Sequence, residues 1–210
     1  MSKRWLGILA TWIWLLPGPA LGADAVMGTG IVTGTVTLEG RATSDAVVSV
    51  TGPKGENLKA GPAAMEPARA TVEQRGMKFI PRVSAVRVGT LVSFPNDDKT
   101  WHNVYSASET KSFDLGLFPP GESRGVTMDK AGVVRILCNV HPTMEAYVVV
   151  MNHPFFAVPN ERAVYRIPSL PVGEYRLEVW HPEAGTRTEL FKIARPGEVR
   201  VMDVDLSRSR

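Results

Sequence analysis

Short stretches in which apolar and polar residues alternate run through most of the chain beyond residue 30. Alternation with a period of two is typical of β-strands with one buried face, and no segment shows the longer period of an amphipathic helix. Turn residues separate the stretches at short, regular intervals, as in β-sandwiches. The pattern predicts an all-β protein with strands over residues 31–38, 46–50, 71–74, 78–88, 90–94, 101–106, 125–128, 133–138, 145–151, 162–167, 173–180 and 199–206.

The predicted strands fall into three groups along the chain. Residues 52–69 contain Gly, Pro, Lys and Ala without periodicity and indicate a linker or a long loop. A second series of strands begins at about residue 70, and a third begins after residue 152. About 187 residues follow the N-terminal segment, which suffices for one large domain or two small ones.

The first 23 residues have the pattern of a secretory signal peptide. Lys3 and Arg4 precede an apolar run over residues 5–16, which ends at Pro17 and small residues. This run is shorter than the roughly 20 residues of a membrane-spanning helix. We therefore expect export, to the periplasm in a bacterial source, with cleavage within residues 20–25 and no membrane span afterwards. An uncleaved N-terminal anchor is the alternative.

The charge pattern does not indicate a partner. The chain has 24 Lys and Arg residues against 21 Asp and Glu, and without Lys3 and Arg4 the balance is 22 to 21. The pI of about 9.1 is therefore misleading for the processed chain. No basic patch supports nucleic-acid binding.

The segment from Cys138 to Met144 carries the candidate chemistry. It reads Cys-x2-His-x2-Met, with His141 in the middle, and Cys138 is the only cysteine in the chain. In an oxidising compartment a lone thiol is paired with another chain, reactive or bound to a metal. Alternation places Cys138 on the same face as Val134 and Ile136, so its side chain is predicted to point inward.

A thiolate, an imidazole and a thioether form most of the ligand set of a blue-copper site, which needs one more histidine. His102, on a separate predicted strand, is well placed to supply it. We expect His102, Cys138, His141 and Met144 to hold one copper ion. Two further histidines, His153 and His181, each precede proline and are expected to be structural, with a second metal site as the less favoured alternative.

Residues 70–152 resemble the cupredoxin family, most closely the amicyanin and plastocyanin-like proteins. The matches are Val88 to Asn96 before the first copper histidine, His102-Asn103-Val104, Ala131-Gly132 and the short spacing from Cys138 to Met144. The resemblance implies a Greek-key β-sandwich with the copper ligands named above. It also implies that the Asn103 backbone N–H bonds the cysteine sulfur. Ile136-Leu137 departs from the aromatic residues that amicyanin-like sequences tend to have there.

The flanking segments resemble the carboxypeptidase regulatory-like domain, a small transthyretin-like β-sandwich. The resemblance covers residues 31–50 joined to 157–181; residues 34–36 and 46–50 match its first half and residues 165–175 its second. The resemblance implies that residues 29–60 and 153–206 form one sandwich, into which residues 70–152 are inserted. Exported proteins described as methylamine utilisation proteins have a similar combination.

Several functions are compatible with these residues. The first is a periplasmic one-electron carrier, not an enzyme, whose redox partner is an exported dehydrogenase or a cytochrome and whose electron port is the His141 ring edge. The second is a copper-handling protein without electron transfer, although the eight methionines are scattered. A hydrolase using Cys138 and His141 is disfavoured because catalytic Cys and His normally come from separate segments. A sandwich that has lost copper is disfavoured by the complete ligand set.

Overall fold

A computed structural model of the chain describes residues 28–58 and 68–207, and this part is entirely β. No helix that could span a membrane occurs among these residues. The strands of the N-terminal part are β1 (Thr29–Leu38), β2 (Arg41–Ala42) and β3 (Val47–Thr51). Those of the middle part are β4 (Arg69–Thr71), β5 (Glu73–Gln74), β6 (Phe79–Ile80), β7 (Val83–Arg87), β8 (Thr90–Pro95), β9 (His102–Ala107), β10 (Ser112–Phe118), β11 (Ser123–Met128), β12 (Gly132–Leu137) and β13 (Glu145–Met151). Those of the C-terminal part are β14 (Phe156–Ala157), β15 (Val164–Pro171), β16 (Gly173–His181), β17 (Gly185–Ile193), β18 (Val199–Val201) and β19 (Val204–Leu206).

The N-terminal and C-terminal strands together form one sandwich. One sheet has β1 between β15 and β18, with β19 and β2 also paired to β1, and the other has the order β14-β3-β16-β17. Alternate residues of these strands point between the sheets, where Val36, Val50, Tyr165 and Leu177 belong to one buried cluster. The pairing of β1 with β15 joins residues 129 to 142 positions apart.

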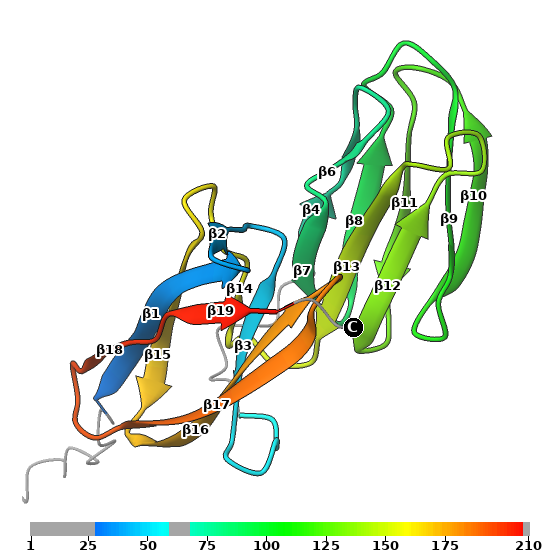
Figure 1. Cartoon of the computed structure of the whole chain (residues 1–210). Coiled ribbons are helices and arrows are strands. Elements are labelled where there is room, and N and C mark those ends of the chain that lie inside the picture. The colour runs from blue at the N-terminus through cyan, green and yellow to red at the C-terminus, as the bar shows by residue number, and fades with distance from the viewer. Residues whose placement is uncertain (1–27, 59–67, 208–210) are drawn as a thin grey trace, which may run out of the picture.

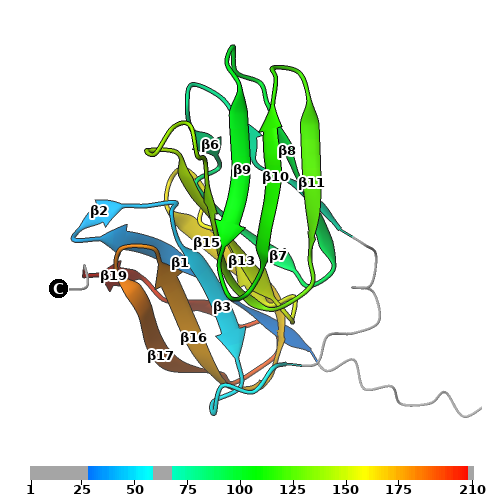
Figure 2. The ribbon, with the colours of Figure 1, turned by 90° about the vertical axis from the view of Figure 1, so that its right-hand side faces the viewer.

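The middle strands form a second sandwich with its own core. One sheet has the order β10-β9-β12-β13-β7 and the other has the order β11-β8-β4, while β5 and β6 form a separate hairpin. Its buried cluster includes Phe94, Val104, Phe118 and Ile136. Figure 1 shows the two sandwiches as separate bodies joined along β3, β7 and β13, and Figure 2 shows the same arrangement from the side.

The contact between the sandwiches is apolar at its centre and charged at its edge. Val47, Val83 and Val149 form a third buried cluster there, and the rings of Tyr147 and Trp180 lie 5.5 Å apart. At the edge, Arg82 Nη1 lies 2.9 Å from a carboxylate oxygen of Asp45 and 3.4 Å from one of Glu183. Arg82 belongs to the middle part, and both carboxylates belong to the flanking sandwich.

The predicted all-β fold is confirmed, and most of the predicted strands lie within two residues of the observed ones. Four strands were not predicted: β10, β17 and the two-residue strands β2 and β14. In β10 the alternation is broken at Gly116, whose φ of 71° accompanies a register shift between Asp114 and Leu117. The predicted strand over 199–206 is divided into β18 and β19. The predicted signal peptide and residues 59–67 of the predicted loop lie outside the described residues.

Candidate metal centre

Two loops at one end of the middle sandwich carry the candidate ligands. The first loop follows β8 and ends where β9 begins, at His102. The second connects β12 to β13 and contains Cys138, His141 and Met144. Figure 1 shows β8 and β12 running toward the same end of the sandwich, so the loops that follow them meet there.

The direction of the Cys138 side chain follows from the strand before it. Val134 and Ile136 are fully buried in the core of the middle sandwich, and Cys138, the next residue in the alternation, is 3% exposed. The prediction that the thiol points inward is therefore confirmed. Leu137 pairs with Tyr105 on β9, which places the end of β12 beside the strand that begins with His102.

The side chains of His102, Cys138 and His141 converge on one point. The two Nδ1 atoms lie 3.0 Å apart, and the Cys138 Sγ lies 4.0 Å from His102 Nδ1 and 3.9 Å from His141 Nδ1. A point equidistant from these atoms is about 2.1 Å from each, within the usual range of about 2.0–2.3 Å for bonds from a metal such as zinc to imidazole and thiolate. Among residues 28–58 and 68–207, this is the only group of three His, Cys, Asp or Glu side chains close enough to share an ion.

Met144 ends the loop that carries Cys138 and His141, and it is 1% exposed. Its side chain belongs to the same buried cluster as Cys138. Its backbone N–H donates to the His141 carbonyl over 2.9 Å, so the loop turns back on itself between the two residues. The thioether is therefore buried in the core that also contains Cys138, and its role as the axial ligand stays a prediction.

Burial differs sharply among the four side chains. His102, Cys138 and Met144 are buried, whereas His141 is half-buried. The neighbouring Val140 and Trp101 are exposed apolar residues, and so is Leu117, which pairs with Asn103 across β10 and β9. Among the four candidate ligands, His141 is therefore the most exposed.

Asp98 contacts the ring of His102 on the side away from the thiol. Its Oδ2 lies 3.1 Å from His102 Nε2 and also accepts the Met77 backbone N–H over 2.7 Å, while Oδ1 accepts the Lys99 N–H over 2.9 Å. The two backbone hydrogen bonds, assisted by the imidazole, lower the pKa of Asp98 to about 2. Asp98 is therefore a carboxylate at neutral pH.

Two asparagines hold the ligand loops in place. The buried Asn96 donates from Nδ2 to the carbonyls of Thr100 and Phe118, and its Oδ1 accepts the Asp98 N–H. Asn103 donates to Asp114 over 2.7 Å, and its Oδ1 accepts the Asn139 N–H over 3.4 Å. These bonds of Asn103 come from its side chain, whereas the bond predicted for it uses the backbone N–H and stays a prediction.

The donor set fits copper. A thiolate and two imidazoles in one plane, with a thioether beside them, form the ligand set of blue-copper sites, and soft sulfur ligands favour copper over hard cations. The four side chains can hold one copper ion, which would supply a centre that gains and loses one electron. The arrangement is cupredoxin-like.

Comparison with known proteins adds matches at the level of structure only. No protein-family model matches the sequence, and no curated protein does. Among solved structures, a reduced amicyanin variant is similar at 24% identity, covering 42% of this chain and 88% of its own, with a TM-score of 0.38. A copper-containing nitrite reductase from Thermus scotoductus is 28% identical over 45% of this chain and 25% of its own, with a TM-score of 0.39.

A purple cupredoxin from Nitrosopumilus maritimus is similar at 23% identity, covering 39% of this chain and 99% of its own, with a TM-score of 0.36. All three TM-scores are below 0.5. The ligand residues and the distances between them, and not these similarities, indicate a copper centre.

The remaining histidines do not join the three-residue group. His153 and His181 are both buried, and each accepts a backbone N–H at Nδ1, from Phe155 and from Glu183 respectively. Burial lowers the pKa of His153. Phe118 is fully buried in the core of the middle sandwich, whereas Trp101, which precedes His102 in the sequence, is exposed.

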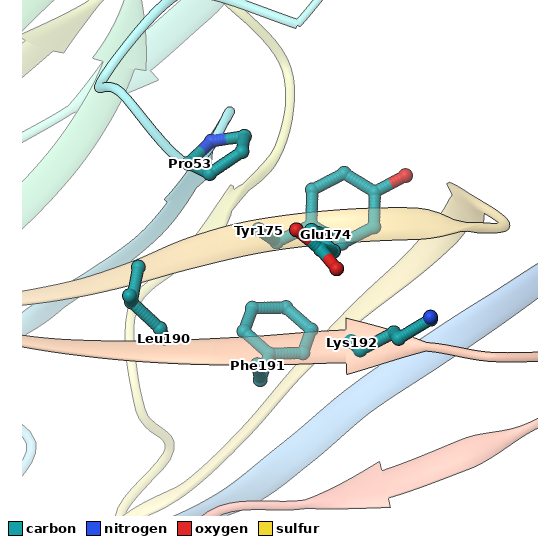
Figure 3. Close-up of a pocket in the computed structure, with 6 residues that line it drawn as sticks. All are labelled: Pro53, Glu174, Tyr175, Leu190, Phe191 and Lys192. Carbon is teal, nitrogen blue, oxygen red and sulfur yellow. The ribbon is translucent and has the colours of Figure 1, made fainter.

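Two hollows, on the flanking sandwich and between the sandwiches, are lined by residues other than the candidate ligands. One, of about 260 Å³, lies along β16 and β17 and is lined by Pro53, Glu174, Tyr175, Leu190, Phe191 and Lys192 (Figure 3). None of these six is a predicted ligand. A larger one, of about 310 Å³, lies between the sandwiches and includes His153 and Trp180.

Asp98 was not among the site residues predicted from the sequence. The available signal was its position four residues before His102, in the turn that follows β8. A carboxylate near a metal-binding histidine often orients the imidazole. Its other partner, the Met77 N–H, comes from the β5–β6 turn and is brought close only by the fold.

Proposed function

We propose that this protein is an exported one-electron carrier with a single blue-copper ion held by His102, Cys138, His141 and Met144. The observation that carries the proposal is the convergence of one thiolate and two imidazole nitrogens beside a buried thioether. Such a ligand set accommodates Cu(I) and Cu(II) with little movement, as fast electron transfer requires.

The burial of the ligands supports a carrier. Three of the four side chains are buried, so an ion among them would be shielded from bulk water. The half-buried His141 would then provide the route for an electron, and the exposed Val140, Trp101 and Leu117 would form an apolar docking face around it. Apolar faces of this kind suit a transient protein partner. We propose an exported dehydrogenase or a cytochrome as that partner.

The first experiment is a copper titration of the full chain, followed by visible absorption. An intense thiolate-to-copper band that is absent in Cys138→Ser would support the blue site. Copper binding without the band would contradict the proposal, because Cys138 would then not be a ligand.

A second measurement separates an electron carrier from a copper-handling protein. A carrier should be reduced and reoxidised repeatedly while it retains its copper in the presence of a Cu(I) chelator. Loss of the reduced ion to the chelator would favour copper handling. Export is tested independently by fractionating cells that express the full chain and measuring the N-terminal mass of the recovered protein, which should lack residues 1–23.

A further inference from the structure

The carboxylate of Asp98 is directed at the ring of a proposed copper ligand. It bonds His102 Nε2, and the opposite nitrogen, Nδ1, faces Cys138 and His141. His102 is completely buried, so bulk water cannot replace this partner. A neutral imidazole that donates from Nε2 has an unprotonated Nδ1, which is the form that binds a metal.

The position of Asp98 is fixed from three directions. Asn96 binds its backbone N–H, while the Lys99 and Met77 N–H groups bind its two carboxylate oxygens. Gly76 and Met77 both have positive φ, 61° and 54°, as in a type I′ turn, which turns the Met77 N–H toward Asp98. The carboxylate is therefore held in place before any metal binds.

We propose that Asp98 is a positioning residue that holds His102 in its metal-binding tautomer and makes the site favour Cu(II) over Cu(I). This inference rests on the proposed copper function. The physical basis is the negative charge next to the ligand, which stabilises the more highly charged ion and orients the imidazole. Removal of the charge should therefore raise the reduction potential.

The test compares Asp98→Asn, Asp98→Ala and Asp98→Glu with the matched control Asp97→Asn. Asp97 is exposed and lies one residue away, so its substitution removes the same formal charge from the same loop. Charges in solvent are strongly screened, and we expect a much smaller effect from the control. Asp98→Glu retains the charge and should stay closer to the wild type, and circular dichroism verifies that each variant is folded.

The first readout is the reduction potential of the copper-loaded protein, because it reports the ratio of the affinities for Cu(II) and Cu(I). Substitution of a residue that orients a metal ligand typically reduces metal affinity by about 10- to 100-fold. We expect Asp98→Asn to lower this ratio about tenfold, which equals about 59 mV for a one-electron couple. A reduction potential in Asp98→Asn and Asp98→Ala equal to that of Asp97→Asn would overturn the proposal.

The copper-free protein gives a second readout. Nitrogen NMR of His102 should show the proton on Nε2 in the wild type and a mixture of tautomers in Asp98→Ala. The same tautomer in both proteins would overturn the positioning role. If the wild type failed to form a blue site, the proposed function would fail separately, whereas the copper-free measurement would still decide whether Asp98 orients the ring.

Discussion

Met144 has two predicted roles that a pair of substitutions separates. Its side chain is 1% exposed in the core of the middle sandwich, so Met144→Ala should leave a cavity and cost about 2–5 kcal/mol of unfolding free energy in the copper-free protein. Met144→Leu nearly conserves volume and should cost less than about 1.5 kcal/mol. Loss of the thioether in Met144→Leu should nevertheless raise the reduction potential, because an axial donor stabilises Cu(II).

The assays are chemical denaturation of the copper-free protein and potentiometric titration of the copper-loaded one. Met128→Leu is the matched control, because Met128 is fully buried in the same cluster but pairs with Thr90, at the end of β8 opposite the site. The control should change stability by a similar amount and leave the potential unchanged. An unchanged potential in Met144→Leu would refute the axial role, and a cost below about 1 kcal/mol in Met144→Ala would refute the packing argument.

Three further predictions concern the flanking sandwich. In Gly34→Ala the new methyl group would overlap the Met202 carbonyl, so we expect a loss of at least about 2 kcal/mol in unfolding free energy, seen as a lower melting temperature; a wild-type melting curve would contradict this. Tyr165→Phe removes a partly buried hydrogen bond of 2.7 Å to the Met202 carbonyl and should cost about 0.5–1.5 kcal/mol in urea denaturation. Burial lowers the pKa of His153, so on acidification this side chain is protonated more readily in the unfolded chain than in the folded one. The free energy of unfolding should therefore fall as the pH drops below about 6.5. His153→Gln should reduce that fall in urea denaturation measured across this pH range.

The strands could be predicted where apolar and polar residues alternate in step with buried and exposed side chains. Strands with clean alternation, such as Gly173–His181, were found within one residue of the predicted bounds. β10 was missed because a positive-φ glycine interrupts its alternation. β17 has an exposed outer face and lies at an edge of its sheet, so its apolar residues do not form a continuous signal. The assignment of the flanking sandwich to the carboxypeptidase regulatory-like family stays a prediction.

The candidate site was predictable as far as its residues are close in sequence or chemically unusual. Cys138 and His141 share a loop, and the chemistry of that pair called for a distant histidine. The contribution of Asp98 was not predictable, because a carboxylate before a strand is ordinary unless its partners are known. Those partners include the Met77 backbone, 21 residues away, which no side-chain pattern indicates.

The strand that follows the ligand loop explains how the two sandwiches are related to the site. Alternate residues of β13, Ala146, Val148 and Val150, lie in the core of the middle sandwich. The residues between them, including Tyr147 and Val149, pack against the flanking sandwich. A strand covered on both faces is expected to be a continuous apolar run and not an alternating one, and residues 146–151 are such a run. β13 also pairs in parallel with β7, which carries Val83 into the same contact. The flanking sandwich therefore supports the strand in which the ligand loop ends and leaves the His141 side of the loop at the surface.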